Sequence, residues 1–380
     1  MTRRAFLHIG LPKTGTTYLQ QVLWENKARL AELGVLLPGA TRRRHLLASL
    51  DVREDPRLAR RSGDVSAPWQ DLVEECLHWD GDVLVSHEFF GAASTEQVRR
   101  LVDSLPGFDV HPVITARAMS DLGVSRWQEW VKSGGALPVD EYPRKREYDP
   151  TDEWGWGSFD LADILDRWAA ALPPERIQVL PIAPGRGSPD ELWSRFAEVL
   201  GLDGREFTVP QVPANPSLGV VEVELLRRIN PLLHDFKSAA DRGNWIRGFL
   251  AEGGILPNRR EKFRAGAEKQ KQLVERGDRA LRLLRDGRFD VRGDLECLRP
   301  GYPSGVRHPS EVTDDEMLES ATIAIANMLR TIRSLTEERD AQREALRSRS
   351  PARRAAVAAG QIGHWWHTFA PAKRRKLGKD

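Results

Sequence analysis

The first part of the chain alternates two patterns of apolar residues. Short, nearly continuous apolar runs, typical of buried parallel strands, occupy residues 5–9, 82–86, 110–116 and 176–182. Between and after these runs, apolar residues recur every three or four positions, which predicts helices over 16–33, 95–105, 160–172, 190–200, 220–234 and 260–286. This alternation predicts an α/β fold in which helices flank a central parallel sheet, followed by a helical C-terminal region.

The end of the chain has a different pattern. Residues 301–312 are rich in Pro, Gly and Ser and predict a linker after a domain over 1–300. Over 313–348 the apolar residues keep a 3-then-4 spacing, which predicts an amphipathic helix. It either packs on its own domain or forms a short coiled coil, through which the chain could form a homodimer. Residues 349–380 combine aromatic and basic side chains and predict either a flexible solvated tail or a contact with an anionic membrane surface.

Charge and cysteine content narrow the class of protein. The 380 residues carry a formal net charge of only +2, which argues against bulk nucleic-acid binding but leaves room for a local basic pocket. The two cysteines, Cys76 and Cys297, form no CxxC pair, so neither a zinc site nor a disulfide framework is expected. The apolar stretch after Met1 is too short for a signal peptide or a membrane span. We therefore expect a cytoplasmic protein without a metal.

The most informative segment is the loop GLPKTGTT, residues 10–17, between the first predicted strand and the first predicted helix. In that position, backbone N–H groups and the helix dipole can hold an anion. Gly10 and Gly15 match the nucleotide-hydrolase loop G-x-x-x-x-G-K-[ST], but Thr16 stands where that loop has its lysine. The lysine here is Lys13, inside the loop, where it could contact a group bonded to a 5′-phosphate.

PKTGTT after the first strand resembles the 5′-phosphosulfate loop of sulfotransferases that use 3′-phosphoadenosine 5′-phosphosulfate (PAPS). Other sequence segments of the chain are also similar to those of bacterial, especially actinobacterial, sulfotransferase-like proteins. The resemblance implies a P-loop NTPase-like sulfotransferase fold and PAPS as the co-substrate. It also implies a first group of cofactor-binding residues, namely Lys13, Thr14, Gly15, Thr16 and Thr17.

A second motif follows the strand at 110–116. Arg117 ends the strand and Ser125 lies eight residues later, on the next helix. In sulfotransferases an Arg and a Ser at this spacing bind the 3′-phosphate, and Asp121 matches a further position of that motif. Chemically, arginine presents a fixed fork of donors to a phosphate. The chain departs from the family at Ala118-Met119, where many members have Asn-Pro or Asp-Pro. The chain also lacks the RKG-x-x-G-D-W sequence that is the C-terminal cofactor motif of cytosolic sulfotransferases. A basic loop at 242–245 or at 258–260 could instead contact the adenosine of the cofactor.

Sulfuryl transfer needs a cation beside the leaving group and a base for the acceptor proton. Lys13 is predicted to be the cation. The strand at 82–86 ends in Ser86-His87-Glu88, and the resemblance implies either His87 or Glu88 as the base. We favour His87, because its unperturbed pKa suits proton removal near neutral pH. His45 is a weaker third candidate.

The sequence thus predicts transfer of a sulfuryl group to a hydroxyl or amine of a small-molecule, sugar or lipid-linked acceptor. Two alternatives remain open at this stage. One is a kinase-like phosphotransferase that uses ATP, which the position of Lys13 disfavours. The other is a non-catalytic scaffold with a vestigial loop, which the presence of Lys13, Arg117 and Ser125 disfavours.

Overall fold

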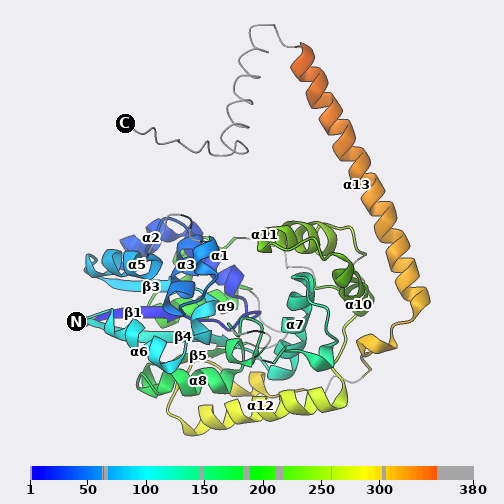
Figure 1. Cartoon of the computed structure of the whole chain (residues 1–380). Helices are drawn as coiled ribbons and strands as arrows, with labels where there is room; N and C mark the ends of the chain where they lie inside the picture. The colour runs from blue at the N-terminus through cyan, green and yellow to red at the C-terminus, as the bar shows by residue number, and fades with distance from the viewer. Residues whose placement is uncertain are drawn as a thin grey trace, which may run out of the picture. The chain divides into compact units, whose positions relative to one another are not determined.

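A parallel sheet forms the centre of the larger compact unit of the protein, whose structure is a computed structural model (Figure 1). It describes residues 2–61, 63, 67–145, 147, 149, 151–182, 189–210, 217–257, 259–301 and 305–348. Six strands of these residues pair in parallel in the order β2-β3-β1-β4-β5-β6. Their bounds are Arg3–His8 (β1), Val35–Leu36 (β2), Asp82–Ser86 (β3), Phe108–Ala116 (β4), Gln178–Pro181 (β5) and Asp290–Val291 (β6). The predicted α/β class with a central parallel sheet is confirmed.

All four predicted strands are present, as β1, β3, β4 and β5. The sequence did not predict β2 and β6, because a two-residue strand is too short to show a period of its own. β1 lies between β3 and β4. After β1 the chain adds β2 and β3 on one side of it, and it then crosses to add β4, β5 and β6 on the other side. This reversal of strand order is the place where open α/β sheets bind ligands.

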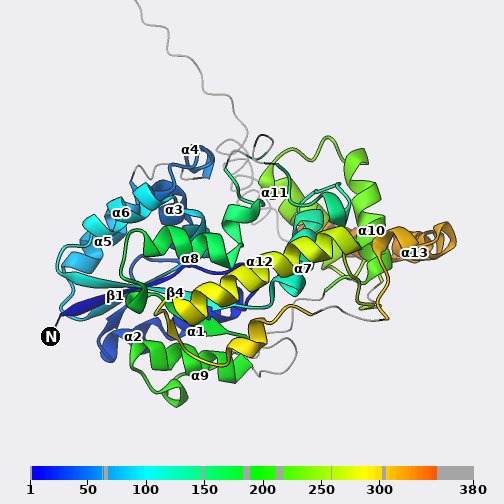
Figure 2. The ribbon, with the colours of Figure 1, turned by 90° about the horizontal axis from the view of Figure 1, so that it is seen from below.

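Helices cover both faces of the sheet (Figure 2). On one face lie α1 (Thr16–Glu25), α2 (Lys27–Glu32) and α9 (Pro189–Leu200), whose apolar side chains share a buried core with Phe6 of β1 and Val113 of β4. The other face carries α3 (Arg42–Val52), α5 (Pro68–Leu77), α6 (Thr95–Asp103) and α8 (Leu161–Ala169). The predicted helix over 16–33 is two helices, because the Asn26 side chain donates to the Val22 carbonyl (2.8 Å) and ends α1 there.

Further helices are α4 (Leu58–Arg61), α7 (Met119–Lys132), α10 (Val220–Ile229), α11 (Ala239–Asp241), a π-helical segment (Arg242–Ala251) and α12 (Ala267–Asp286). The helix predicted over 260–286 begins only at Ala267, because Phe263 pairs with Arg307 in a parallel β-bridge. Arg307 belongs to the predicted linker. Val312, at the end of that linker, packs with Val220 and Val221.

The first compact unit of the chain therefore continues through Ser320. The second unit begins at Ala321, inside α13 (Asp314–Ser348), which is one continuous helix of 35 residues. The predicted tail over 349–380 and Asn258 of the predicted 258–260 loop lie outside the described residues. No helix in the described ranges combines the length and the apolar character needed to cross a bilayer.

Candidate functional site

Three neighbouring strands carry the predicted site residues at their carboxyl ends. Lys13 follows β1, His87 and Glu88 follow β3, and Arg117 follows β4. The ladder between β1 and β4 extends into the loop, since the Leu11 N–H donates to the Thr115 carbonyl (2.8 Å) and the Thr115 N–H donates to the Gly10 carbonyl (2.7 Å). The loop that carries Lys13 is thereby held against the end of β4.

The loop needs its glycines. Gly10 and Gly15 have φ of 114° and 86°, in the region that favours glycine. A Cβ on Gly10 would lie 3.3 Å from the Glu88 Cβ, and a Cβ on Gly15 would lie 2.5 Å from the Leu192 side chain. The Thr14 hydroxyl points inward, where it meets the Thr115 hydroxyl at 2.6 Å. Thr14 therefore supports the loop with its side chain and offers no hydroxyl to a ligand.

The N-terminus of α1 offers free backbone donors. No hydrogen bond within the described ranges uses the N–H groups of Gly15, Thr16 or Thr17, and no side chain caps this helix. Gly15 and Thr17 are exposed, whereas Thr16 is buried. Free N–H groups at the positive end of a ten-residue helix are suited to bind an anion.

Arg117 and Ser125 lie beside this site. The Arg117 guanidinium approaches the Lys13 carbonyl oxygen at 3.5 Å and the Asp121 carboxylate at 3.6 Å. On α7, Asp121, Ser125 and Glu129 are four residues apart and so share one face of the helix. Because Arg117 contacts Asp121 and Lys13 contacts Glu129, Ser125 lies on the face of α7 that is turned toward the loop.

Lys13 is held by a carboxylate that sequence reasoning did not single out. Its ammonium is 2.9 Å from Glu129, which also pairs with Lys132 (2.6 Å) and contacts Arg247. Burial by itself would raise the pKa of Glu129, but the surrounding cations Lys13, Lys132 and Arg247 outweigh it and lower the pKa to about 2. Burial also lowers the pKa of Lys13, although Glu129 opposes this effect.

This ion network joins the loop, α7 and the segment after α11. Lys132 is almost fully buried and reaches Glu252 at 2.6 Å, while Arg247 comes from the π-helical segment Arg242–Ala251. Glu129 and Lys132 lie one and two turns beyond Ser125, so helical spacing could have indicated them. No sequence signal places Arg247 and Glu252 here, because they come from a distant part of the chain.

His87 and Glu88 have different surroundings. Glu88 packs against Gly10 and accepts a weak hydrogen bond from Gln20 of α1 (3.4 Å). The His87 ring lies against α3, where its Nδ1 is 3.3 Å from the Ser49 hydroxyl, and the same nitrogen accepts from the Phe89 N–H (3.2 Å). Of the two candidate bases, Glu88 is therefore the one that contacts the loop.

The ionisation states of His87 and Glu88 also differ. Burial lowers the pKa of His87, and only the neighbouring Glu88 opposes this, so the imidazole is neutral near pH 7. Burial by itself would raise the pKa of Glu88, but the charge that His87 carries when protonated and the backbone N–H of Glu88 outweigh it, and the pKa lies below its ordinary value. Glu88 is thus ionised at neutral pH, and its lowered pKa makes it a weaker base than an ordinary glutamate.

His45, the third candidate base, is buried and contacts the backbone through both ring nitrogens. Its Nδ1 accepts from the Ser86 N–H (3.1 Å) and its Nε2 is 2.9 Å from the Pro38 carbonyl oxygen. Burial lowers its pKa to about 4. With both ring nitrogens engaged by the backbone, His45 fixes the end of β3.

Comparisons with known proteins add little. No protein-family model matches the chain, and no curated protein matches it. Among solved structures, a sulfotransferase from Alicyclobacillus acidocaldarius is similar, with 16% identity and a TM-score of 0.36 over 64% of this chain and 100% of that chain. A likeness at this identity and TM-score carries no information about function.

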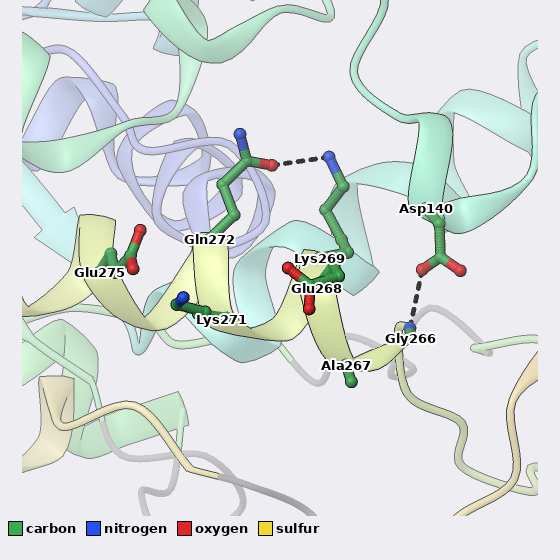
Figure 3. Close-up of a pocket in the computed structure, with 8 residues that line it drawn as sticks. All are labelled: Asp140, Gly266, Ala267, Glu268, Lys269, Lys271, Gln272 and Glu275. Carbon is green, nitrogen blue, oxygen red and sulfur yellow. Dashed lines mark hydrogen bonds between the residues drawn. The ribbon is translucent and has the colours of Figure 1, made fainter.

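A separate hollow of about 580 Å³ opens at the N-terminal end of α12 (Figure 3). Asp140 accepts from the Gly266 N–H (2.7 Å) at its rim, and Lys269 donates to Gln272 (2.8 Å). Its lining mixes acidic and basic side chains and contains none of the predicted site residues. No three His, Cys, Asp or Glu side chains in the described ranges are grouped so that they could hold a metal ion.

Proposed function

We propose that the protein transfers a sulfuryl group from PAPS to a hydroxyl or amine of a small-molecule, sugar or lipid-linked acceptor. The observation that carries this proposal is the meeting of three features at the ends of β1 and β4. These are the free N–H groups at the start of α1, the ammonium of Lys13 and the guanidinium of Arg117. Together they suit a ligand with more than one anionic group.

The residues present fit PAPS. The N–H groups of Gly15, Thr16 and Thr17 would hold the 5′-phosphosulfate, as backbone donors at helix N-termini hold other phosphates. Arg117, with Ser125 beside it on α7, would hold the 3′-phosphate. PAPS supplies the sulfuryl group, and no metal is required for these contacts.

The reaction breaks the bond between sulfur and the 5′-phosphate oxygen and forms a bond between sulfur and the acceptor oxygen or nitrogen. Lys13 would stabilise the negative charge that develops on the 5′-phosphate oxygen. We assign removal of the acceptor proton to Glu88, because Glu88 packs against Gly10 of the loop while His87 contacts α3. In this assignment His87 supports the position of Glu88.

Calorimetric titration tests the cofactor assignment. We expect adenosine 3′,5′-bisphosphate to bind more tightly than ADP, which lacks the 3′-phosphate that Arg117 would hold. Replacing a charged hydrogen-bond partner costs about 1.5–3 kcal/mol, so Arg117→Ala should weaken the bisphosphate roughly ten- to a hundredfold. The same change should leave ADP almost unaffected.

Arg99→Ala is a matched control, because Arg99 is an exposed arginine on α6 whose guanidinium contacts Glu96 (3.9 Å) and the Ala170 carbonyl oxygen (3.1 Å) and none of the predicted site residues. It should change neither affinity. If ADP or ATP binds as tightly as the bisphosphate, or if Arg117→Ala weakens all three ligands equally, the PAPS assignment is wrong.

A further inference from the structure

An exposed apolar stripe runs along α13. Ile325, Leu329, Ile332 and Leu335 are 54–63% exposed, and their spacing of four, three and three residues places them on one face of the helix. Isolated apolar residues on a surface are normal, but four on one face of one helix indicate an interaction surface.

The sequence around this stripe fits a coiled-coil seam. With Ile325 and Ile332 at the a positions of a heptad, Met328 and Leu335 fall at the d positions and Leu329 at a flanking e position. The next a and d positions are polar, Arg339 and Gln342, and polar a residues fix the register of a coiled coil at a cost in stability. Isoleucine at a combined with leucine at d favours two parallel strands over higher oligomers. The seam therefore suits a second, similar helix better than a flat protein surface.

The charged residues beside the seam indicate what that second helix is. Between Leu318 and Leu346, the flanking e and g positions hold only two charged residues, Glu338 at g and Arg343 at e. Neither of them is in an ion pair within the described ranges. In a parallel, in-register pair of helices, a g residue meets the e residue five positions later on the partner helix. Glu338 and Arg343 are five residues apart.

Two copies of α13 would thus form two reciprocal Glu338–Arg343 pairs. In an antiparallel pair, g positions face g positions and e positions face e positions, so these opposite charges would not meet. We propose that the protein forms a homodimer through a parallel, in-register, two-stranded coiled coil of α13 helices. This proposal is independent of the proposed function.

Analytical ultracentrifugation of the full chain across low micromolar concentrations tests the dimer. We expect a mass twice the chain's 42.8 kDa. Ile332→Asp should weaken self-association by about a hundredfold or more, because it places two like charges in the seam in place of buried apolar surface. Ser334→Asp adds the same charge at an exposed position of the same helix outside the seam, and it should leave the dimer intact.

Charge reversal tests the orientation. Glu338→Arg and Arg343→Glu should each weaken the dimer, and the double variant should restore it. Leu335→Cys should form an intermolecular disulfide under mild oxidation, because the parallel register brings the two copies of residue 335 side by side. The unchanged protein, with buried Cys76 and partly buried Cys297, is the control.

A chain that stays monomeric, or a dimer that Ile332→Asp leaves intact, would overturn the proposal. Failure of the double charge variant to recover, or of Leu335→Cys to cross-link, would overturn the parallel register. Circular dichroism checks that each variant keeps its helices and its main unfolding transition.

Discussion

Glu129→Gln is the most direct test of the ion network around Lys13, because it removes one charge and keeps the shape of the side chain. The Glu129 side chain is only 9% exposed and its carboxylate is shared by Lys13, Lys132 and Arg247. Lys13 is 27% exposed and Arg247 38% exposed, so both can turn toward water when the carboxylate is lost. Lys132 is 1% exposed and would keep only Glu252.

The cost follows from these values. The pKa of Glu129 lies at about 2, below its ordinary value near 4.5. At 1.36 kcal/mol per unit, this difference corresponds to about 3 kcal/mol of folding free energy at pH 7. Removing one partner of a buried ion pair elsewhere costs about 3–5 kcal/mol, which is consistent. We therefore expect Glu129→Gln to lower the free energy of unfolding by about 3 kcal/mol.

The direction of the Glu129 pKa shift predicts how the stability difference changes with pH. The folded pKa of Glu129 is depressed, so its stabilising effect is complete above about pH 4.5 and is lost as the pH falls toward 2. The difference in stability between the variant and the unchanged protein should shrink over the same range. Urea unfolding followed by tryptophan fluorescence at pH 7, 4 and 3 measures it.

Glu206→Gln is the matched control, because Glu206 pairs with Arg29 at the surface and is 42% exposed. Its cost should stay below about 1 kcal/mol. A cost for Glu129→Gln that is equally small at pH 7, or that does not change with pH, would refute the inferred role of the network. Because Lys13 and Arg247 lose their anion, we also expect the variant to bind adenosine 3′,5′-bisphosphate more tightly.

Two further predictions concern catalysis, with release of adenosine 3′,5′-bisphosphate from PAPS as the readout. Lys13→Ala should lower turnover on the order of a hundredfold, and it should weaken cofactor binding much less, because its charge matters most in the transition state. A variant that keeps its turnover and only raises KM would show that Lys13 serves binding alone. Glu88→Gln should lower turnover by more than tenfold and leave cofactor affinity unchanged, while His87→Ala should have the smaller effect. The reverse order of the two variants, with an intact fold by circular dichroism, would transfer the base to His87.

The sequence alone determined the class of fold and the position of the loop, because both depend on local patterns. Apolar runs of five to seven residues predict β1, β3, β4 and β5 from their own composition. The loop at 10–17 is a local feature as well, since its glycines and the helix that follows belong to one stretch of chain. Arg117 at the end of a strand is predicted by the same local pattern.

Only the tertiary structure decided which of these residues meet. Strand order cannot be derived from strands taken one at a time, yet the position of β1 between β3 and β4 is what brings Lys13, Glu88 and Arg117 to one edge of the sheet. The contacts of Glu129 with Lys13 and Arg247 join residues more than a hundred positions apart, so no local pattern records them. Which of His87 and Glu88 contacts the loop is likewise a matter of tertiary structure. Adjacent side chains on an extended backbone point in opposite directions, and only the packing of Gly10 on one side and α3 on the other shows which of the two contacts the loop.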